Sequence, residues 1–269
     1  VTRTGIEGMK IYMIPNFEGM TIGRFAVVLM DALGQLFYSI SVAMGIMIAY
    51  GSYVKKETNI VKSVNQIEIF DTMVAFLAGM MIVPAVYTFM GTEGMSAGPS
   101  LMFISLPKVF QAMGAIGTVV GVVFFVMVAF AALTSSVSVM EAVVSSVMDK
   151  WHVNREKATV CVGAYALIAG IIVCLGYNLF YFELRLPNDS VGQILDVMDY
   201  ISNFVLMPVV ALATCVLVGW VISPKSIIDE VTRNGERFGR AKLYVAMIKV
   251  VAPVLLLFLL LQSLGLVKL

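Results

Sequence analysis

Long apolar runs constrain this chain more than any other feature of its sequence. Six of them extend approximately over residues 25–50, 70–90, 115–148, 158–182, 200–222 and 243–267. An α-helix of about 20 apolar residues crosses the ~30 Å hydrocarbon core of a bilayer, and the short alternating strands of a membrane barrel do not occur in this sequence. The sequence therefore predicts an all-α, polytopic bundle of six transmembrane helices. We expect one membrane domain over residues 1–269, located in the cell (plasma) membrane.

Composition agrees with a membrane protein and argues against an enzyme. Hydrophobic residues make up 60% of the chain and charged residues 13%, and the mean hydropathy is +0.95. A soluble domain of this length cannot bury so much apolar side chain. The three cysteines, Cys161, Cys174 and Cys215, lie in apolar runs and are expected to be small buried hydrophobes. The sequence has no metal-ligating cluster and no nucleophile beside a base, so we expect neither enzymatic activity nor an organic cofactor.

Basic residues indicate the orientation of the bundle. The connectors after the first, third and fifth runs carry 11 of them, against six on the opposite side. Because cytoplasmic loops are enriched in Lys and Arg, the richer side is expected to be inside and Val1 outside. Val1 is not an initiator methionine, and we expect the sequence to be a fragment that lacks an odd number of preceding spans.

Two connectors are predicted to contain structure of their own. Residues 91–114 are apolar and contain proline but are too short to cross the bilayer, so we expect a re-entrant or a surface-lying helical hairpin on the outer face. Residues 225–232 are predicted to form a short amphipathic helix on the inner face. The spacing Gly117-x-x-x-Gly121 permits close helix packing, although it also recurs by chance.

The first apolar run contains hydroxyl groups and a glycine at mid-membrane depth, in the segment Ser39–Gly45. Unwound backbone at this depth is tolerated only where it lines a protein cavity, and its freed carbonyl groups are hard oxygen ligands that suit a small alkali cation. The alternative is a continuous helix in which the serines bond to the preceding turn. This segment alone does not decide between the two.

Two further features favour an ion site. Thr134, Ser135, Ser136 and Ser138 place four hydroxyl groups within five residues of the third run. Ala131, Thr134 and Ser135 lie on one helical face. Asp71 opens the second run among apolar neighbours, and an acid within the membrane is a candidate functional residue. Together these features support an ion site.

The segments GQLFYSISVAMG, IAYGSYVKK, FAALTSSVSVM and LDVMDY resemble the second half of the neurotransmitter:sodium symporter family, especially its bacterial amino-acid transporters. The resemblance extends over essentially the whole chain. It implies a family fold of two inverted five-helix repeats with a locally unwound helix, of which the six runs resemble helices six to eleven. The implied partners are a lipid bilayer, a small amino acid or amine substrate, and an N-terminal five-helix repeat outside this sequence; nucleic acid is not among them.

The resemblance also implies ligands for sodium ions. Ala131, Thr134 and Ser135 match ligands of the second sodium site, and Ser39 and Asp71 match ligands of the first. Many family members have asparagine where Asp71 stands, and chloride-dependent relatives bind an anion near a position that Ala75 holds here. We therefore expect Asp71 to supply the negative charge that chloride provides elsewhere.

Substrate and gate residues follow from the same resemblance. Tyr38, Ser41, Met44, Ser135 and Val139 are expected to line the substrate pocket. Asp199 matches the acid of the outer gate, whereas Tyr53 and Asp149 match the inner gate. Asp149 and Asp199 also lie at predicted membrane edges, where an acid is often only solvated.

Two functional interpretations follow. The first is a sodium-coupled symporter of amino acids or related amines that works by alternating access around a mid-membrane site, represented here by its C-terminal part. The second is a truncated, non-transporting membrane scaffold or half-transporter, because the residues matching gates and ion sites lack their partners within this sequence.

Overall fold

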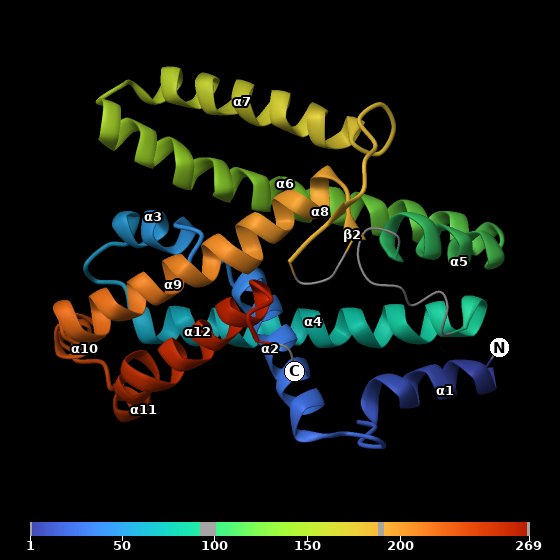
Figure 1. Cartoon of the computed structure of the whole chain (residues 1–269), viewed down its shortest axis with the longest axis horizontal. Coiled ribbons are helices and arrows are strands. Elements are labelled where there is room, and N and C mark those ends of the chain that lie inside the picture. Colours follow the sequence, from blue (N-terminus) through green and yellow to red (C-terminus); the bar gives the residue numbers. More distant parts are fainter. Residues whose placement is uncertain (1, 92–100, 188–190, 268–269) are drawn as a thin grey trace. The chain divides into compact units, whose positions relative to one another are not determined.

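The structure is a computed structural model that describes residues 2–91, 101–187 and 191–267 (Figure 1). The chain divides into two compact units, one made of Val1–Met20 with Gln66–Ser136 and the other of Thr21–Asn65 with Val137–Leu269. We describe each unit by itself. The expected single domain over residues 1–269 stays a prediction.

The first unit is built on the long helices α4 (Ile60–Met90) and α6 (Ala115–Trp151), each of which has one end in the second unit. Helix α1 (Thr2–Met13) packs on α4, where a Cβ at Gly8 would lie 2.8 Å from the Cα of Pro84. Close approach of the two helices therefore depends on the glycine. Helix α1 precedes the first apolar run and was not predicted from the sequence.

A short helical connector completes this unit. It consists of a π-helical stretch, Leu101–Ser105, and helix α5 (Leu106–Ala112). Val86 of α4 packs with Leu106 and Val109 of the connector in a small apolar core. The described part of the expected outer hairpin is thus helical, while its residues 92–100 lie outside the described residues.

The second unit begins with helices α2 (Ile22–Ser39) and α3 (Ile46–Tyr53). After α6 come helix α7 (Arg155–Leu175) and a short antiparallel pairing of strands β1 (Leu184–Arg185) and β2 (Val191–Gly192). The unit ends with two long helical segments. The first contains α8 (Ile194–Asp199) and α9 (Met207–Val216), the second contains α11 (Ala241–Ala246) and α12 (Ala252–Ser263), and α10 (Pro224–Val231) lies between them.

Both long segments contain π-helical stretches within a continuous helix. These are Tyr200–Leu206 and Leu217–Val221 in the first segment and Met247–Val251 in the second. Pro208 and Pro253 follow two of these stretches. Proline has no backbone N–H to donate to the preceding turn, and the wider π-helical turn before each proline accommodates the missing hydrogen bond. Ala211 and Cys215 of α9 pack with Leu256 of α12 in the apolar core of this unit.

Five of the six predicted membrane helices are confirmed, with two differences from the predicted runs. Among the described residues, five helices are long and apolar enough to cross a membrane. The remaining predicted run, 25–50, is divided between α2 and α3. Helix α7 ends at Leu175, earlier than the predicted run, because the chain turns at Gly176–Phe180.

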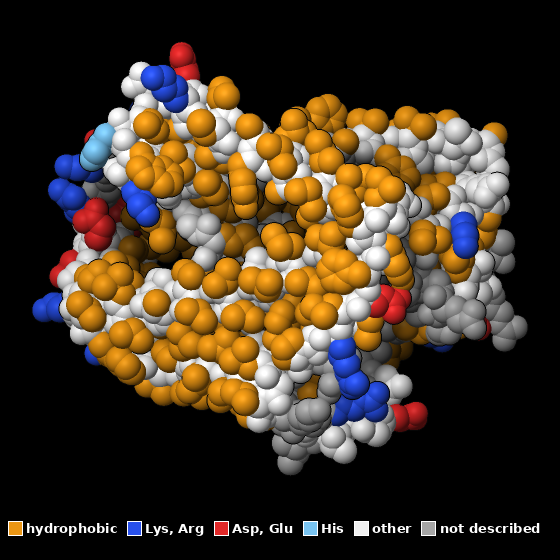
Figure 2. All heavy atoms as spheres, turned by 45° about the horizontal axis from the view of Figure 1, so that its top comes forward, with side chains coloured by type: hydrophobic (Ala, Val, Ile, Leu, Met, Phe, Trp, Pro, Cys, Tyr) orange, Lys and Arg blue, Asp and Glu red, His pale blue; other side chains and the backbone are white. Residues whose placement is uncertain are grey.

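Most of the surface of these helices is apolar. Figure 2 shows hydrophobic side chains over most of the visible face, and helical residues such as Ile116 and Val160 are 71% and 70% exposed. A water-soluble protein rarely exposes continuous apolar surface of this extent. Together with the five spanning helices, this identifies a multi-pass membrane protein.

Two of the charged connectors contact each other, while the orientation of the bundle in the membrane stays a prediction. Helix α10 confirms the amphipathic helix expected at 225–232. Ser223 caps its N-terminus, where the serine hydroxyl accepts a hydrogen bond from the N–H of Lys225. Beyond it, the side-chain amide of Asn234 donates to the carbonyl of Lys56 at 2.6 Å. The connectors after the first and fifth predicted runs therefore meet, as connectors on one side of the membrane should.

Candidate functional site

The break between α2 and α3 lies within the segment that the sequence singled out. Helix α2 ends at Ser39, and α3 begins at Ile46. In between, the backbone is left-handed at Ser41, Ala43 and Gly45, with φ of 57°, 64° and 79°. Left-handed backbone is strained for residues with a Cβ and cannot continue a right-handed helix. The structure thus rejects the alternative of a continuous helix.

The two sides of the break are attached to different elements of the second unit. Phe37 and Ala43 pack against the core of α9 and α12. On the other side, Met44 packs against a cluster formed by Ile46 and Ala49 of α3 with Ala142 of α6. The segment 40–45 is therefore a joint between one helix held by α9 and α12 and another held by α6.

The hydroxyl-rich part of α6 brings two of the expected sodium ligands together. The Thr134 hydroxyl donates hydrogen bonds to the carbonyls of Phe130 and Ala131, at 3.1 and 2.9 Å. The oxygens of Ala131 and Thr134 are thus adjacent on one face of the helix. Ser136 donates to the carbonyl of Leu133 at 2.8 Å instead. Ser135 lies next to Thr134 on the same helix, and its part in ion binding stays a prediction.

The other expected ligands are divided between the two units. Ser39 ends α2 in the second unit, whereas Asp71 lies in the part of α4 that belongs to the first. Of the expected substrate residues, Tyr38 lies in the last turn of α2, and Ser41 and Met44 lie within the break. Val139 lies on α6, one turn after Ser135. Shared ligation by these residues stays a prediction.

A cavity of about 290 Å³ opens beside the break in the second unit. Met44 and Gly45 line it from the break, and Ser146, Lys150 and Trp151 are among the lining residues of α6. The Lys150 ammonium lies 5.4 Å from the centre of the Trp151 ring, a favourable cation–π distance. Of the expected substrate residues, only Met44 lines this cavity.

Helix α3 is joined to α6 by two tyrosines one turn apart. The hydroxyl of Tyr50 bonds that of Ser138 at 2.5 Å, and the hydroxyl of Tyr53 donates to Oε1 of Glu141 at 2.7 Å. The hydrogen bond to Glu141 raises the pKa of Tyr53 above its ordinary value. Oε2 of Glu141 forms a salt bridge with Arg155 at the start of α7.

Tyr53 and Asp149 match the expected inner gate, and that role stays a prediction. In this network Tyr53 bonds Glu141, which precedes Asp149 by eight residues on α6. The sequence analysis did not identify Glu141 or Arg155. The available signal was an acid within the apolar run 115–148, since a charged residue at membrane depth is a candidate functional residue.

Asp199, the expected outer-gate acid, is the last residue of α8. The side-chain amide of Asn203, one turn further, donates to its Oδ1. The carboxylate is thus held by its own helix, and its role in a gate stays a prediction.

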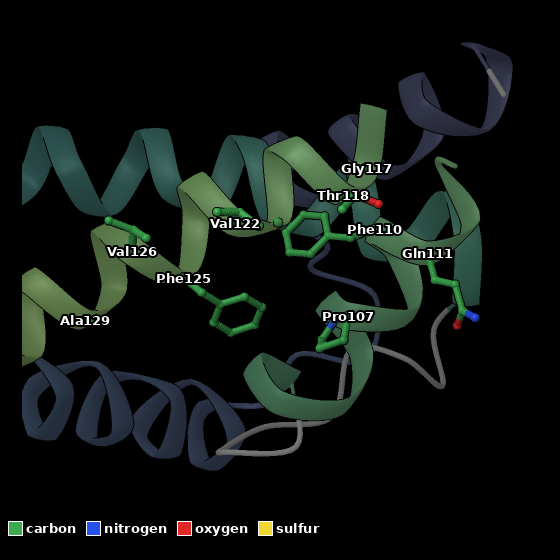
Figure 3. A pocket seen from close by; sticks show the side chains of 10 residues that line it. Pro107, Phe110, Gln111, Gly117, Thr118, Val122, Phe125, Val126 and Ala129 are labelled. Carbon is green, nitrogen blue, oxygen red and sulfur yellow. The ribbon is translucent and has the colours of Figure 1, made fainter. Parts of the chain in front are cut away.

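A second open cavity, of about 630 Å³, lies in the first unit between α5 and α6 (Figure 3). The rings of Phe110 and Phe125 face it, and its lining is almost entirely apolar. A Cβ at Gly121 would lie 3.0 Å from the Phe110 ring, so Gly117-x-x-x-Gly121 allows close packing of α5 on α6 as predicted. This cavity does not gather the polar groups that an ion requires.

Comparison with known proteins gives a consistent result. The family model described as the sodium:neurotransmitter symporter family matches residues 1–268. An uncharacterized sodium-dependent transporter of Haemophilus influenzae is 31% identical over 96% of this chain, and the sodium-dependent transporter YhdH of Bacillus subtilis is 30% identical over 98%. The chain covers 54% and 56% of their lengths, so it spans about half of each relative.

A solved structure agrees with these relatives. The crystal structure of MhsT in complex with L-phenylalanine superimposes with a TM-score of 0.82 and 28% sequence identity, over 97% of this chain and 56% of that one.

Proposed function

Because the chain belongs to the sodium:neurotransmitter symporter family, we propose that it acts in the sodium-coupled uptake of an amino acid or a related amine. The observation that supports this function most is the break of the first apolar run at residues 40–45. Interrupted helices at membrane depth provide backbone oxygens for cations, and their helix ends attract the charged groups of a substrate.

The proposed ion sites use hard oxygen ligands. Thr134 and the carbonyl of Ala131 form one candidate pair on α6, to which we add Ser135; Ser39 and Asp71 are the candidates for the other site. These residue types fit Na⁺, which prefers carbonyl, hydroxyl and carboxylate oxygens. No covalent chemistry is involved, so the proposed function is not enzymatic.

Coupling requires only that Na⁺ and substrate favour the same conformation. One charge that crosses 100 mV contributes roughly 2.3 kcal/mol, and the sodium concentration gradient adds to this driving force. Tyr38, Ser41, Met44, Ser135 and Val139 are the proposed substrate contacts, Asp199 the outer gate, and Tyr53 with Asp149 the inner gate.

Uptake into lipid vesicles tests the function. The protein is reconstituted, and labelled neutral amino acids, L-phenylalanine first, are supplied with an inward sodium gradient. We expect accumulation above the external concentration with Na⁺ and none when K⁺ replaces it. Equal uptake in both salts, or no sodium-dependent binding of any amino acid or amine, would contradict the proposal and favour a scaffold without transport.

A matched pair of variants tests the ion site. Thr134→Ala removes a hydroxyl that is adjacent to the Ala131 carbonyl, whereas Ser136→Ala removes one that bonds the Leu133 carbonyl on another face of the same helix. We expect the sodium concentration for half-maximal uptake to rise about tenfold or more in the first variant, the effect of losing roughly 1.4 kcal/mol of binding. It should change little in the second.

A further inference from the structure

Tyr200 joins the two long helical segments of the second unit. Its hydroxyl donates a hydrogen bond to the main-chain carbonyl of Ser263, the last residue of α12, at 2.7 Å. Both residues are buried, with 6% and 5% of their surface exposed. The last four carbonyls of a helix have no partner within the helix. The phenol of Tyr200 therefore supplies a donor that this buried end of α12 requires.

The residue before Tyr200 is Asp199, the proposed outer gate. Successive side chains of a helix point about 100° apart, so the direction of Asp199 follows from that of its neighbour. When Tyr200 points toward the end of α12, the carboxylate of Asp199 is directed to a different face. Each side chain is also held one turn further on. Asn203 donates to Oδ1 of Asp199, and the ring of Phe204 stacks on that of Tyr200, with centres 6.2 Å apart and planes at 16°.

The rest of the helical segment controls this direction less closely. Residues Tyr200–Leu206 form a π-helical stretch, which separates Asp199 from the part of the segment that is packed on α12 through the apolar core of α9. The π-helical turn is a rare departure from the regular helix and is frequent at functional sites. The contact of Tyr200 with Ser263 fixes the segment beyond the α9 core, directly beside Asp199.

We infer that Tyr200 is a positioning residue for the outer gate, because its hydrogen bond to the end of α12 fixes the rotation of the helix at Asp199. Without the hydroxyl, the ring has no polar contact with α12, and the helix turns more freely at this point. The carboxylate of Asp199 is then in the gating position for a smaller fraction of the time, and bound substrate escapes more often. This inference rests on the proposed function, because Tyr200 acts only through Asp199 as a gate.

A spin label at position 199 measures the positioning directly. In a protein whose native cysteines are replaced by alanine, Asp199→Cys carries the label, and electron paramagnetic resonance reports its mobility in lipid vesicles. We expect Tyr200→Phe, which removes one oxygen atom and keeps the ring, to increase the mobility of the label. Tyr181→Phe is the matched control. The hydroxyl of Tyr181 bonds Glu183, two residues away in the neighbouring connector, so its loss should leave the label unchanged.

Sodium-driven uptake gives the functional measurement. We expect Tyr200→Phe to raise the substrate concentration for half-maximal uptake about three- to tenfold, the range for the loss of one hydrogen bond. The maximum rate should stay within about twofold, because the substrate contacts are intact. Asp199→Asn should also raise the half-maximal concentration. Adding Tyr200→Phe to Asp199→Asn should then raise it no further, since Tyr200 acts through a carboxylate that is already absent.

Thermal unfolding separates positioning from a general loosening of the fold. Tyr200→Phe leaves the buried carbonyl of Ser263 without its donor, so the unfolding midpoint should fall equally in the wild-type and Asp199→Asn backgrounds. A purely structural Tyr200 would also impair uptake equally in both backgrounds. Wild-type label mobility and half-maximal concentration in Tyr200→Phe, or effects on uptake that multiply in the double variant, would overturn the inference.

The outcomes separate this inference from the proposed function. If the wild-type protein shows no sodium-dependent uptake or binding, the proposed function fails, and the spin label still reports whether Tyr200 holds position 199. If uptake is sodium-dependent and Tyr200→Phe behaves as wild type, only the inference fails. Should Tyr200→Phe not fold, Phe204→Leu decides in its place, because it removes the stacked ring and keeps the hydroxyl. Wild-type label mobility and uptake in that variant would then overturn the inference.

Discussion

At the scale of single residues, the hydrogen-bond partners of an acidic side chain indicate its role more clearly than its position in the sequence does. Asp199 is bonded by Asn203 of the same helical segment, whereas Glu141 is held by side chains from two other helices. Asp71 and Asp199 could be selected from the sequence because they lie beside motifs. Glu141 could not be assigned a role, because its partners Tyr53 and Arg155 are distant in the sequence and local patterns do not encode such pairing.

Asp71 gives a prediction at this scale. If its carboxylate supplies the negative charge of a sodium site, Asp71→Asn removes that charge. Another anion must then balance the positive charge of the bound Na⁺. We expect the variant to need chloride for uptake or to lose uptake, while the wild type is indifferent to chloride. The measurement compares uptake in chloride with uptake in gluconate.

The control for Asp71 is Glu68→Gln, which neutralises an acid one turn earlier on α4. It should leave uptake independent of chloride. Wild-type uptake by Asp71→Asn in both anions would refute the assigned role of this carboxylate.

At the scale of elements, the residues of the first run left a broken and a continuous helix both open, and the resemblance implied the break but not its geometry. Serines, a β-branched valine and a glycine within Ser39–Gly45 indicated a weak point in the first run. The left-handed backbone at Ser41 and Ala43 could not be predicted, since neither residue type favours it. This backbone conformation is imposed by packing. Phe37 and Ala43 pack against α9 and α12, whereas Met44 packs against α3 and α6.

Two glycines test whether the break depends on backbone conformation. Gly45 has φ of 79°, and a Cβ there would meet nothing within 4 Å, so Gly45→Ala is penalised by the left-handed backbone alone. We expect a loss of about 1–2 kcal/mol in the free energy of unfolding. Gly51 of α3 is equally open but lies in a regular helix, so Gly51→Ala should instead stabilise by about 0.5–1 kcal/mol.

Thermal unfolding of the purified variants in detergent measures both changes. The two substitutions add the same methyl group to the same short stretch of chain, so a difference in sign between them isolates the backbone effect. A midpoint for Gly45→Ala equal to or above that of the wild type would contradict a left-handed joint.

At the scale of the whole molecule, the place of the apolar runs could be predicted from the sequence, and the side of the membrane on which the basic connectors lie stays a prediction. Hydrophobic length and Lys/Arg distribution are local properties, so they can be read without knowledge of packing. The π-helical stretches, helix α1 and the early end of α7 could not be predicted, because they depend on contacts between elements. The contact of Asn234 with Lys56 supports the shared side of two connectors.

The orientation of the bundle in the membrane is the prediction at this scale. In a protein whose native cysteines have been replaced, single cysteines are introduced at five exposed positions. Thr58, Asn154 and Gly239 lie in the connectors rich in basic residues, and Glu18 and Glu183 lie in the opposite ones. Intact cells are treated with a thiol reagent that cannot cross the membrane. Because the first three positions are expected in the cytoplasm, they should react only after the cells are opened, whereas the other two should react at once. Labelling of Thr58→Cys in intact cells together with protection of Glu183→Cys would reverse the orientation, and it would place the contacts of Glu141 with Tyr53 and Arg155 toward the outer side of the membrane.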